Sequence, residues 1–314
     1  MKVRITVVVL FVCLTGTASF AGGGETTYNF LRNDVSARAA ALGGSFIAVE
    51  NDVNSLFYNP AGLSTLERRQ LSFGFFKHLL DVNSGYISYS QRYRDVGWIG
   101  AGINLINYGE FTRTDNQGNR LGTFGATEFA LTFGYSNLAY QKIHYGASAN
   151  FIYSSIADDQ SVALAFDAGV YYQIEPDRVS VGASILHVGR QLSKYGDTRE
   201  DLPVDLKAGL ALRPEHLPLL LNFSFNRLNE EETDFASRFR AFSIGGEFTL
   251  SDAVRARFGY DNEKRRDLKI GTSAGLAGFS LGAGFLIDRY IFDYAFNSLG
   301  KIGALHRITV GKTL

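Results

Sequence analysis

The stretch SVALAFDAGVYY, residues 161–172, decides the fold, because its side chains alternate between two kinds. Successive side chains of a strand point to opposite faces of a sheet, so this period of two predicts a β-strand. One predicted face carries the large apolar residues Val162, Leu164, Phe166, Ala168, Val170 and Tyr172. The other carries Ser161, Ala163, Ala165, Asp167, Gly169 and Tyr171 and is therefore mostly small or polar.

The segments 144–154, 219–226 and 241–250 alternate in the same way. In the last of them Phe242, Ile244, Phe248 and Leu250 alternate with Ser243, Glu247 and Thr249. A soluble β-sandwich would also alternate, but its outer face would carry many Lys, Glu and Thr side chains to meet water. Here the second face is mostly Ser, Asn, Gly and Ala, which suits the lumen of a barrel whose apolar face meets lipid.

Fourteen such segments can be placed, which predicts an all-β, transmembrane antiparallel barrel of about fourteen strands. They are 70–78, 83–91, 97–108, 124–138, 143–155, 161–173, 178–188, 203–213, 218–228, 239–250, 253–260, 276–287, 290–297 and 304–312. Connections after odd-numbered strands include the long segments 109–123, 189–202 and 261–275, whereas those after even-numbered strands are short. This asymmetry is typical of outer-membrane barrels. A fifteenth candidate, Leu268–Ala274, would break it, and we interpret that segment as loop.

The composition agrees with many strands and excludes other classes. Of 314 residues, 46% are hydrophobic and 20% charged, with 25 Phe, 16 Tyr and 34 Gly. The formal net charge of zero leaves no electrostatic footprint for nucleic acid. Beyond the first twenty residues, no stretch reaches the roughly 18 apolar residues of a membrane helix.

Residues 1–21 have the layout of a cleaved signal peptide. Lys2 and Arg4 precede an apolar run, and small residues lead to a cleavage position after Ala21. We therefore expect export and a location in the outer membrane of a Gram-negative cell. Cleavage removes Cys13, the single cysteine, which excludes thiol catalysis, disulfides and cysteine metal sites from the mature chain.

Residues 22–69 do not follow the strand pattern and are predicted to form a small helical hatch. The segment 36–42 is helix-prone, and Gly43 and Gly44 can end that helix. A second turn after Asn51 would end before Asn59 and Pro60. A fourteen-stranded barrel is too wide for its own side chains to fill, so residues 22–69 are expected to plug a barrel of residues 70–314.

The hatch segment also carries a family resemblance. YNFL at 28–31, SARAAALGGSFIAV at 36–49 and NDVNSLFYNPAGL at 51–63 resemble the N-terminus of the PorV/PorQ family. That family is similar to the FadL-like outer-membrane barrels, which share an Asn-Pro-Ala element in their hatch. The last two predicted strands, with FDYAF at 292–296 and LHRITV at 305–310, resemble the same family. The resemblance implies a hatch motif at Arg38, Gly43, Gly44, Asp52, Asn59, Pro60, Ala61 and Gly62.

Two non-enzymatic functions follow from this resemblance. The PorV/PorQ family implies a component of type IX secretion that exports cargo proteins or attaches them to the cell surface. Its partners would be outer-membrane lipid, other components of that system and the C-terminal domains of cargo. The FadL-like relationship implies the alternative, a passive transporter of hydrophobic small molecules with a hydrophobic ligand in the barrel. Neither function involves a cofactor or nucleic acid.

Sites for chemistry are not evident in the sequence. The histidines at 78, 144, 187, 216 and 306 have no metal-ligand spacing. The Gly-x-Gly elements at 100–102 and 282–284 do not open a helix, and no Gly-x-Ser-x-Gly elbow is present. We therefore predict no catalytic, cofactor-binding or metal site. The charged tips at 230–234 and 264–266 are interpreted as solvated loops, Gly in the strands as relief for curvature and close approach, and Tyr108, Tyr135, Tyr171, Tyr172 and Tyr260 as interfacial aromatics.

Overall fold

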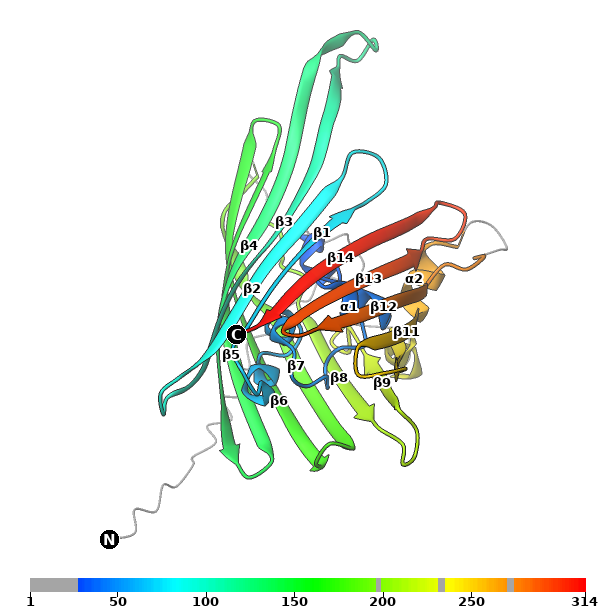
Figure 1. Ribbon diagram of the computed structural model, residues 1–314. Coiled ribbons are helices and arrows are strands. Elements are labelled where there is room, and N and C mark those ends of the chain that lie inside the picture. Colours follow the sequence, from blue (N-terminus) through cyan, green and yellow to red (C-terminus); the bar gives the residue numbers. More distant parts are fainter. Residues whose placement is uncertain (1–27, 196–198, 231–234, 270–273) are drawn as a thin grey trace.

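The computed structural model describes residues 28–195, 199–230, 235–269 and 274–314. Fourteen antiparallel strands close into a barrel in which β1 pairs with β14, as predicted (Figure 1). The expected signal peptide at 1–21 and most of the excluded segment Leu268–Ala274 lie outside the described residues. The strands are β1 Gln70–Lys77, β2 Asn83–Tyr93, β3 Gly97–Thr114, β4 Arg120–Tyr140, β5 Ile143–Ile156, β6 Asp159–Glu175, β7 Val179–Ser193, β8 Asp205–Leu212, β9 Leu219–Phe225, β10 Phe242–Thr249, β11 Val254–Asp261, β12 Phe279–Ile287, β13 Tyr290–Ser298 and β14 Ala304–Thr313.

The alternation of side chains sets the two faces of the wall. In β6, Phe166 and Val170 are exposed on the outside, whereas Ala163 and Ala165 are buried inside. The interpretation of Tyr171 as an interfacial aromatic is wrong, because its side chain is fully buried on the lumen side. Its neighbour Tyr172 is exposed, since adjacent residues of a strand point to opposite faces.

The wall is much taller on one side than on the other. β3 and β4 have 18 and 21 residues and form a hairpin that rises far beyond its neighbours (Figure 1), whereas β8 to β11 have only 7 or 8 residues each. The prediction of a loop over 109–123 is wrong, because the pairing of β3 with β4 continues to Thr114 and Arg120. Phe111 and Phe124 stack across this hairpin with ring centroids 5.4 Å apart, which explains the extension.

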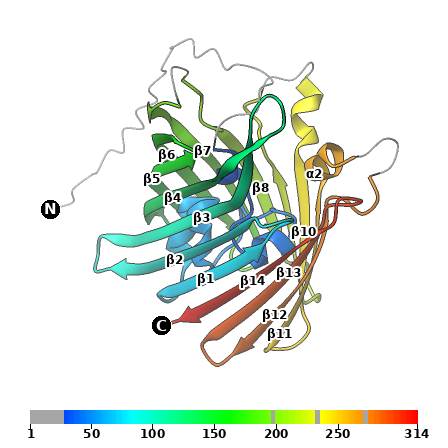
Figure 2. The same ribbon diagram turned by 90° about the horizontal axis from the view of Figure 1, so that it is seen from above.

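The described part of the hatch segment, residues 28–69, lies inside the ring of strands (Figure 2). It contains η1 Asn29–Arg32, α1 Ala37–Ala41, η2 Val53–Phe57 and η3 Pro60–Thr65. The side chains of Ser36, Asp52 and Asn59 accept hydrogen bonds from backbone N–H groups of the first turns of α1, η2 and η3. Of the described helices, η4 Phe235–Arg240 and α2 Asn262–Asp267 lie outside this segment, in connections between strands. None of the described helices is long and apolar enough to cross a membrane.

Candidate functional site

A belt of glycines lines the wall where it meets the hatch. Gly100 pairs across strands with Gly134, Gly146 with Gly169, Gly182 with Gly209, and Gly245 with Gly259. At all eight positions, and at Gly282 on β12, an added Cβ would lie about 3 Å or less from another atom, which in most cases belongs to the hatch. Gly146, for instance, faces the backbone of Pro60 and Ala61. The hatch therefore fits against the wall without space for side chains in between.

Asn59 fastens the hatch at the centre of this contact. Its amide Nδ2 donates to the carbonyl oxygens of Ile47 and Val170, each at 3.0 Å, and its Oδ1 accepts from the N–H of Ala61 at 3.2 Å. Gly169 of β6 leaves the room for this side chain. Pro60 occupies the first position of η3, where a missing N–H is harmless. The Asn-Pro-Ala element thus joins two parts of the hatch to the wall.

On the opposite side of the lumen a chain of buried charges holds α1. The guanidinium of Arg38 donates to both carboxylate oxygens of Glu247 at 2.9 Å and to Asp52 at 3.1 Å. Arg257 continues the chain, contacting Glu247 at 2.5 Å and Asp293 at 2.6 Å. Paired and hydrogen-bonded charges of this kind avoid most of the penalty of burial. This network fixes the position of α1 against β11–β14.

The remaining positions of the predicted hatch motif adjust the backbone. Gly43 and Gly44 follow α1 with φ values of +66° and +80°, a left-handed region that favours glycine. An added Cβ at Gly43 would also meet the backbone of Tyr260 at 2.8 Å, and one at Gly62 would meet the side chain of Ser55. The structure therefore brings Arg38 into contact with Asp52, and Asn59 with Ala61, while these glycines serve separate close approaches.

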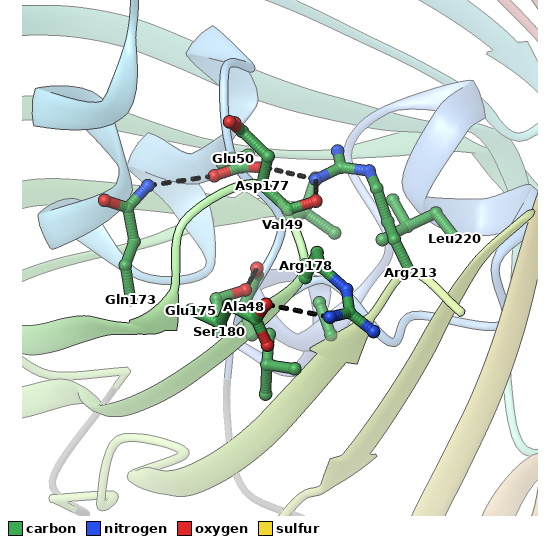
Figure 3. Close-up of a pocket in the computed structure, with 12 residues that line it drawn as sticks. Ala48, Val49, Glu50, Gln173, Glu175, Asp177, Arg178, Ser180, Arg213 and Leu220 are labelled. Carbon is green, nitrogen blue, oxygen red and sulfur yellow. Dashed lines mark hydrogen bonds and ion pairs between the residues drawn. The ribbon is translucent and has the colours of Figure 1, made fainter. Parts of the chain in front are cut away.

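The end of the barrel with short turns has a shallow pocket lined by hatch residues 48–50 and by charged residues of β6–β8 and their turns (Figure 3). Glu50 lies between Arg213, at 2.5 Å, and Gln173, at 3.3 Å, and it also accepts from the hydroxyl of Tyr171 at 3.0 Å. Burial raises the pKa of the Glu50 carboxyl, but the hydrogen bond and charge of Arg213 outweigh it and leave that pKa below its usual range. Glu50 is therefore an anchor between hatch and wall.

The other end of the lumen has a more apolar lining. Tyr28 and Phe30 pack with Ile106, Ile152 and Leu202 in a cluster that Leu31, Val82 and Tyr108 extend. Tyr108, expected at the membrane interface, instead donates its hydroxyl to Glu128 at 2.6 Å. Beside this cluster lies a second, smaller cavity lined by Phe30, Asn33, Asp34, Phe76, His78, Ser84, Asn104 and Ile106.

One pair of side chains has the composition of a nucleophile and its base. Ser64 Oγ lies 2.7 Å from Nδ1 of His144. However, the Ser64 hydroxyl donates to the carbonyl of Ala61 at 2.9 Å, so the imidazole must donate to Ser64. This is the reverse of the arrangement that activates a nucleophile. Among the described residues, no group of three or more His, Cys, Asp and Glu side chains could hold a metal ion.

The sequence analysis missed most of the charges that hold the hatch. Glu247 was placed on the polar face of its strand, but Arg257, Asp293 and Arg307 were not singled out. The available signal was their position, since each falls in the lumen-facing register of β11, β13 or β14 and is buried there. A buried charge requires a partner, so the search could have started from these residues.

Comparison with known proteins agrees with the fold. Residues 16–158 match the model of an uncharacterised protein family, UPF0164. The toluene transporter TbuX of Ralstonia pickettii is similar with a TM-score of 0.61 and 16% identity, over 89% of this chain and 98% of that one. The toluene transporter TodX of Pseudomonas putida has a TM-score of 0.58 at 14% identity, over 89% and 96% of the two chains. A FadL homologue of Pseudomonas aeruginosa has a TM-score of 0.55 at 12% identity, over 89% and 98%. At these identities the likeness concerns the fold alone, and no curated protein matches the sequence.

Proposed function

We propose that this protein is a non-enzymatic outer-membrane barrel through which small apolar molecules cross passively. The observation that carries the proposal is the apolar cluster around Phe30, Ile106 and Ile152 inside the barrel. The interior of a water-filled porin is polar, so an apolar lining suits an apolar solute instead. Support also comes from three similar structures, since two are toluene transporters and one is a FadL homologue.

The proposal includes the organisation of the chain. Residues 1–21 act as a signal peptide that is removed after Ala21, residues 22–69 form the hatch, and residues 70–314 form the barrel. The mass of the mature protein purified from outer membranes tests the cleavage. A mature chain that still contains residues 1–21 would contradict it.

The experiment for transport compares two matched tryptophan variants in Gram-negative host cells. Ala130 is buried in the apolar cluster, and Ala130→Trp would fill that part of the lumen. Ala208 lies on the outer face of β8, so Ala208→Trp makes the same change toward lipid. We expect expression of the wild type to speed uptake of radiolabelled toluene, Ala130→Trp to abolish the gain and Ala208→Trp to keep it. Uptake no faster than in cells without the protein would refute transport of this class.

The second candidate is a role in type IX secretion, which the resemblance of the hatch motif to the PorV/PorQ family favours. None of the comparisons names that family. Purification of the full chain from detergent-solubilised outer membranes of its own host tests this candidate. Co-elution of secreted proteins through their C-terminal domains would support secretion, whereas recovery of lipid and small apolar molecules alone would exclude it.

A further inference from the structure

The small cavity beside the apolar cluster combines a polar floor with apolar walls. Phe76, Ser84, Asn104 and Ile106 contribute lumen-facing side chains of β1–β3, and Phe30 to Asp34 of the hatch close the other side. The space measures about 240 Å³ including the part open to solvent. Its enclosed part has room for about one water molecule, so only a group the size of a hydroxyl or carbonyl fits there.

Asn104 is the unexplained residue of this cavity. It is only 8% exposed, and its side-chain amide has no hydrogen-bond partner among the described residues. Buried amides in folded proteins nearly always have a partner, and one without it points to water or to a ligand. An amide offers both a donor and an acceptor, so it can bind a hydroxyl or a carbonyl group.

The neighbouring polar groups favour a neutral partner for Asn104. Nε2 of His78 lies 2.7 Å from the hydroxyl of Ser84, and burial, together with Arg307, lowers the pKa of His78 to about 4. The imidazole is therefore uncharged at neutral pH. The charges around the cavity, Asp34 and Asp261 against Lys264 and Arg307, balance. Asp34, the carboxylate that lines the cavity, already pairs with Lys264 at 2.6 Å.

We propose that this cavity binds the neutral hydroxyl or carbonyl group of a small apolar molecule through the amide of Asn104. The apolar body of that molecule lies against Phe30, Phe76 and Ile106, in the open part of the space. This inference rests on the proposed transport function and narrows its substrates to apolar molecules with one neutral polar group. Such molecules are then preferred over plain hydrocarbons of the same size.

The test measures binding of benzyl alcohol and toluene to the full-length mature protein in detergent, by equilibrium dialysis of radiolabelled compounds. We expect the wild type to bind benzyl alcohol about tenfold more tightly than toluene, the ratio for one hydrogen bond of ordinary strength. In Asn104→Leu the preference disappears while toluene still binds. Asn107→Leu, on the outer face of the same strand, is the control and keeps the preference.

A second variant guards against misfolding of the first. Asn104→Asp keeps the shape and an acceptor but loses the donor. It should retain benzyl alcohol, which can donate, and lose at least about tenfold in affinity for acetophenone, which can only accept. Equal binding of toluene and benzyl alcohol by the wild type, or an unchanged preference in Asn104→Leu, would overturn the inference. If toluene uptake by cells persists in that case, the transport function stands and only the substrate preference falls.

Discussion

The hatch meets the barrel wall through two different kinds of contact. Toward β3–β8 the glycine belt brings apolar side chains and backbone of η2, η3 and residue 47 directly against the strands. Toward β10–β14 the contact is the chain of buried charges from Asp52 through Arg38, Glu247 and Arg257 to Asp293. One contact depends on the absence of side chains, and the other on the pairing of long ones.

This difference separates closeness from orientation. Glycines allow a dry, close fit, but a smooth surface does not by itself select one rotation of the hatch. Buried ion pairs contribute little net stability, because removal of both charges from water is costly, yet they are satisfied in one arrangement only. The glycine side therefore seals the lumen, and the charged side specifies how the hatch is seated.

The largest effect is expected from the charged side. Arg38→Ala leaves Asp52 without its cation and removes one of two cations from Glu247. Removal of one member of a buried ion pair typically costs about 3–5 kcal/mol, and we expect a loss of that order in the free energy of unfolding. Urea titration of the protein in lipid vesicles measures it.

Arg38→Lys is the matched variant for this prediction. It keeps the charge but cannot make the paired contacts of a guanidinium with Glu247, so part of the loss should remain. If Arg38→Ala unfolds at the urea concentration of the wild type, the charged side does not hold the hatch, and the comparison fails on that side.

A smaller loss is expected from the glycine side. In Gly146→Ala the new Cβ would lie within 3 Å of the backbone of Pro60 and Ala61, and backbone cannot move aside as a side chain can. Overpacking of this kind costs about 1–3 kcal/mol in the free energy of unfolding. The control is Gly311→Ala on β14, where the nearest atom would lie at an ordinary 3.5 Å. Equal stability of the two variants would mean that the hatch has room to shift.

The sequence predicted the wall better than these contacts. Alternation in single segments, such as Leu219 to Phe225, is a local property, so strand number, closure and the inward face of β6 followed from it. Side-chain partners across the lumen are not local. Arg257 and Asp293 belong to β11 and β13, which flank β12, and Arg38 reaches Glu247 only because the barrel surrounds the hatch. The pattern predicted which residues face inward, but not which of them meet.

A similar limit applies to the hairpin of β3 and β4. Gly109, Gly118 and Gly122 interrupt the alternation there, which is why 109–123 was interpreted as a loop. Gly109 and Gly122 have positive φ and lie near the two shifts in register between these strands, so the pairing passes through irregularities that a strict period of two does not allow.

Acid should weaken a third, smaller anchor, the Glu50–Arg213 pair. The pKa of Glu50 in the folded protein lies below its ordinary value of 4.5, so the pair stabilises the fold at neutral pH. That contribution is lost as the pH falls below about 4.5 and through the lowered pKa. Because the Arg213 side chain is 40% exposed, we expect at most about 1 kcal/mol. Urea titrations between pH 7 and 3 should show a smaller loss of stability in Glu50→Gln than in the wild type, and equal losses would contradict this role.

The smallest expected quantity tests whether the two sides of the hatch act independently. Arg38 and Gly146 share no contact partner, so in the double variant Arg38→Ala with Gly146→Ala the two losses should add to within about 0.5 kcal/mol. Additivity means that each side holds its own part of the hatch. If instead the charged side alone seats the hatch as one body, Arg38→Ala already frees it from the glycine belt, and Gly146→Ala then costs much less in that background. The coupling energy from a double-mutant cycle in urea distinguishes the two, and a strong coupling would replace two separate contacts by one cooperative attachment.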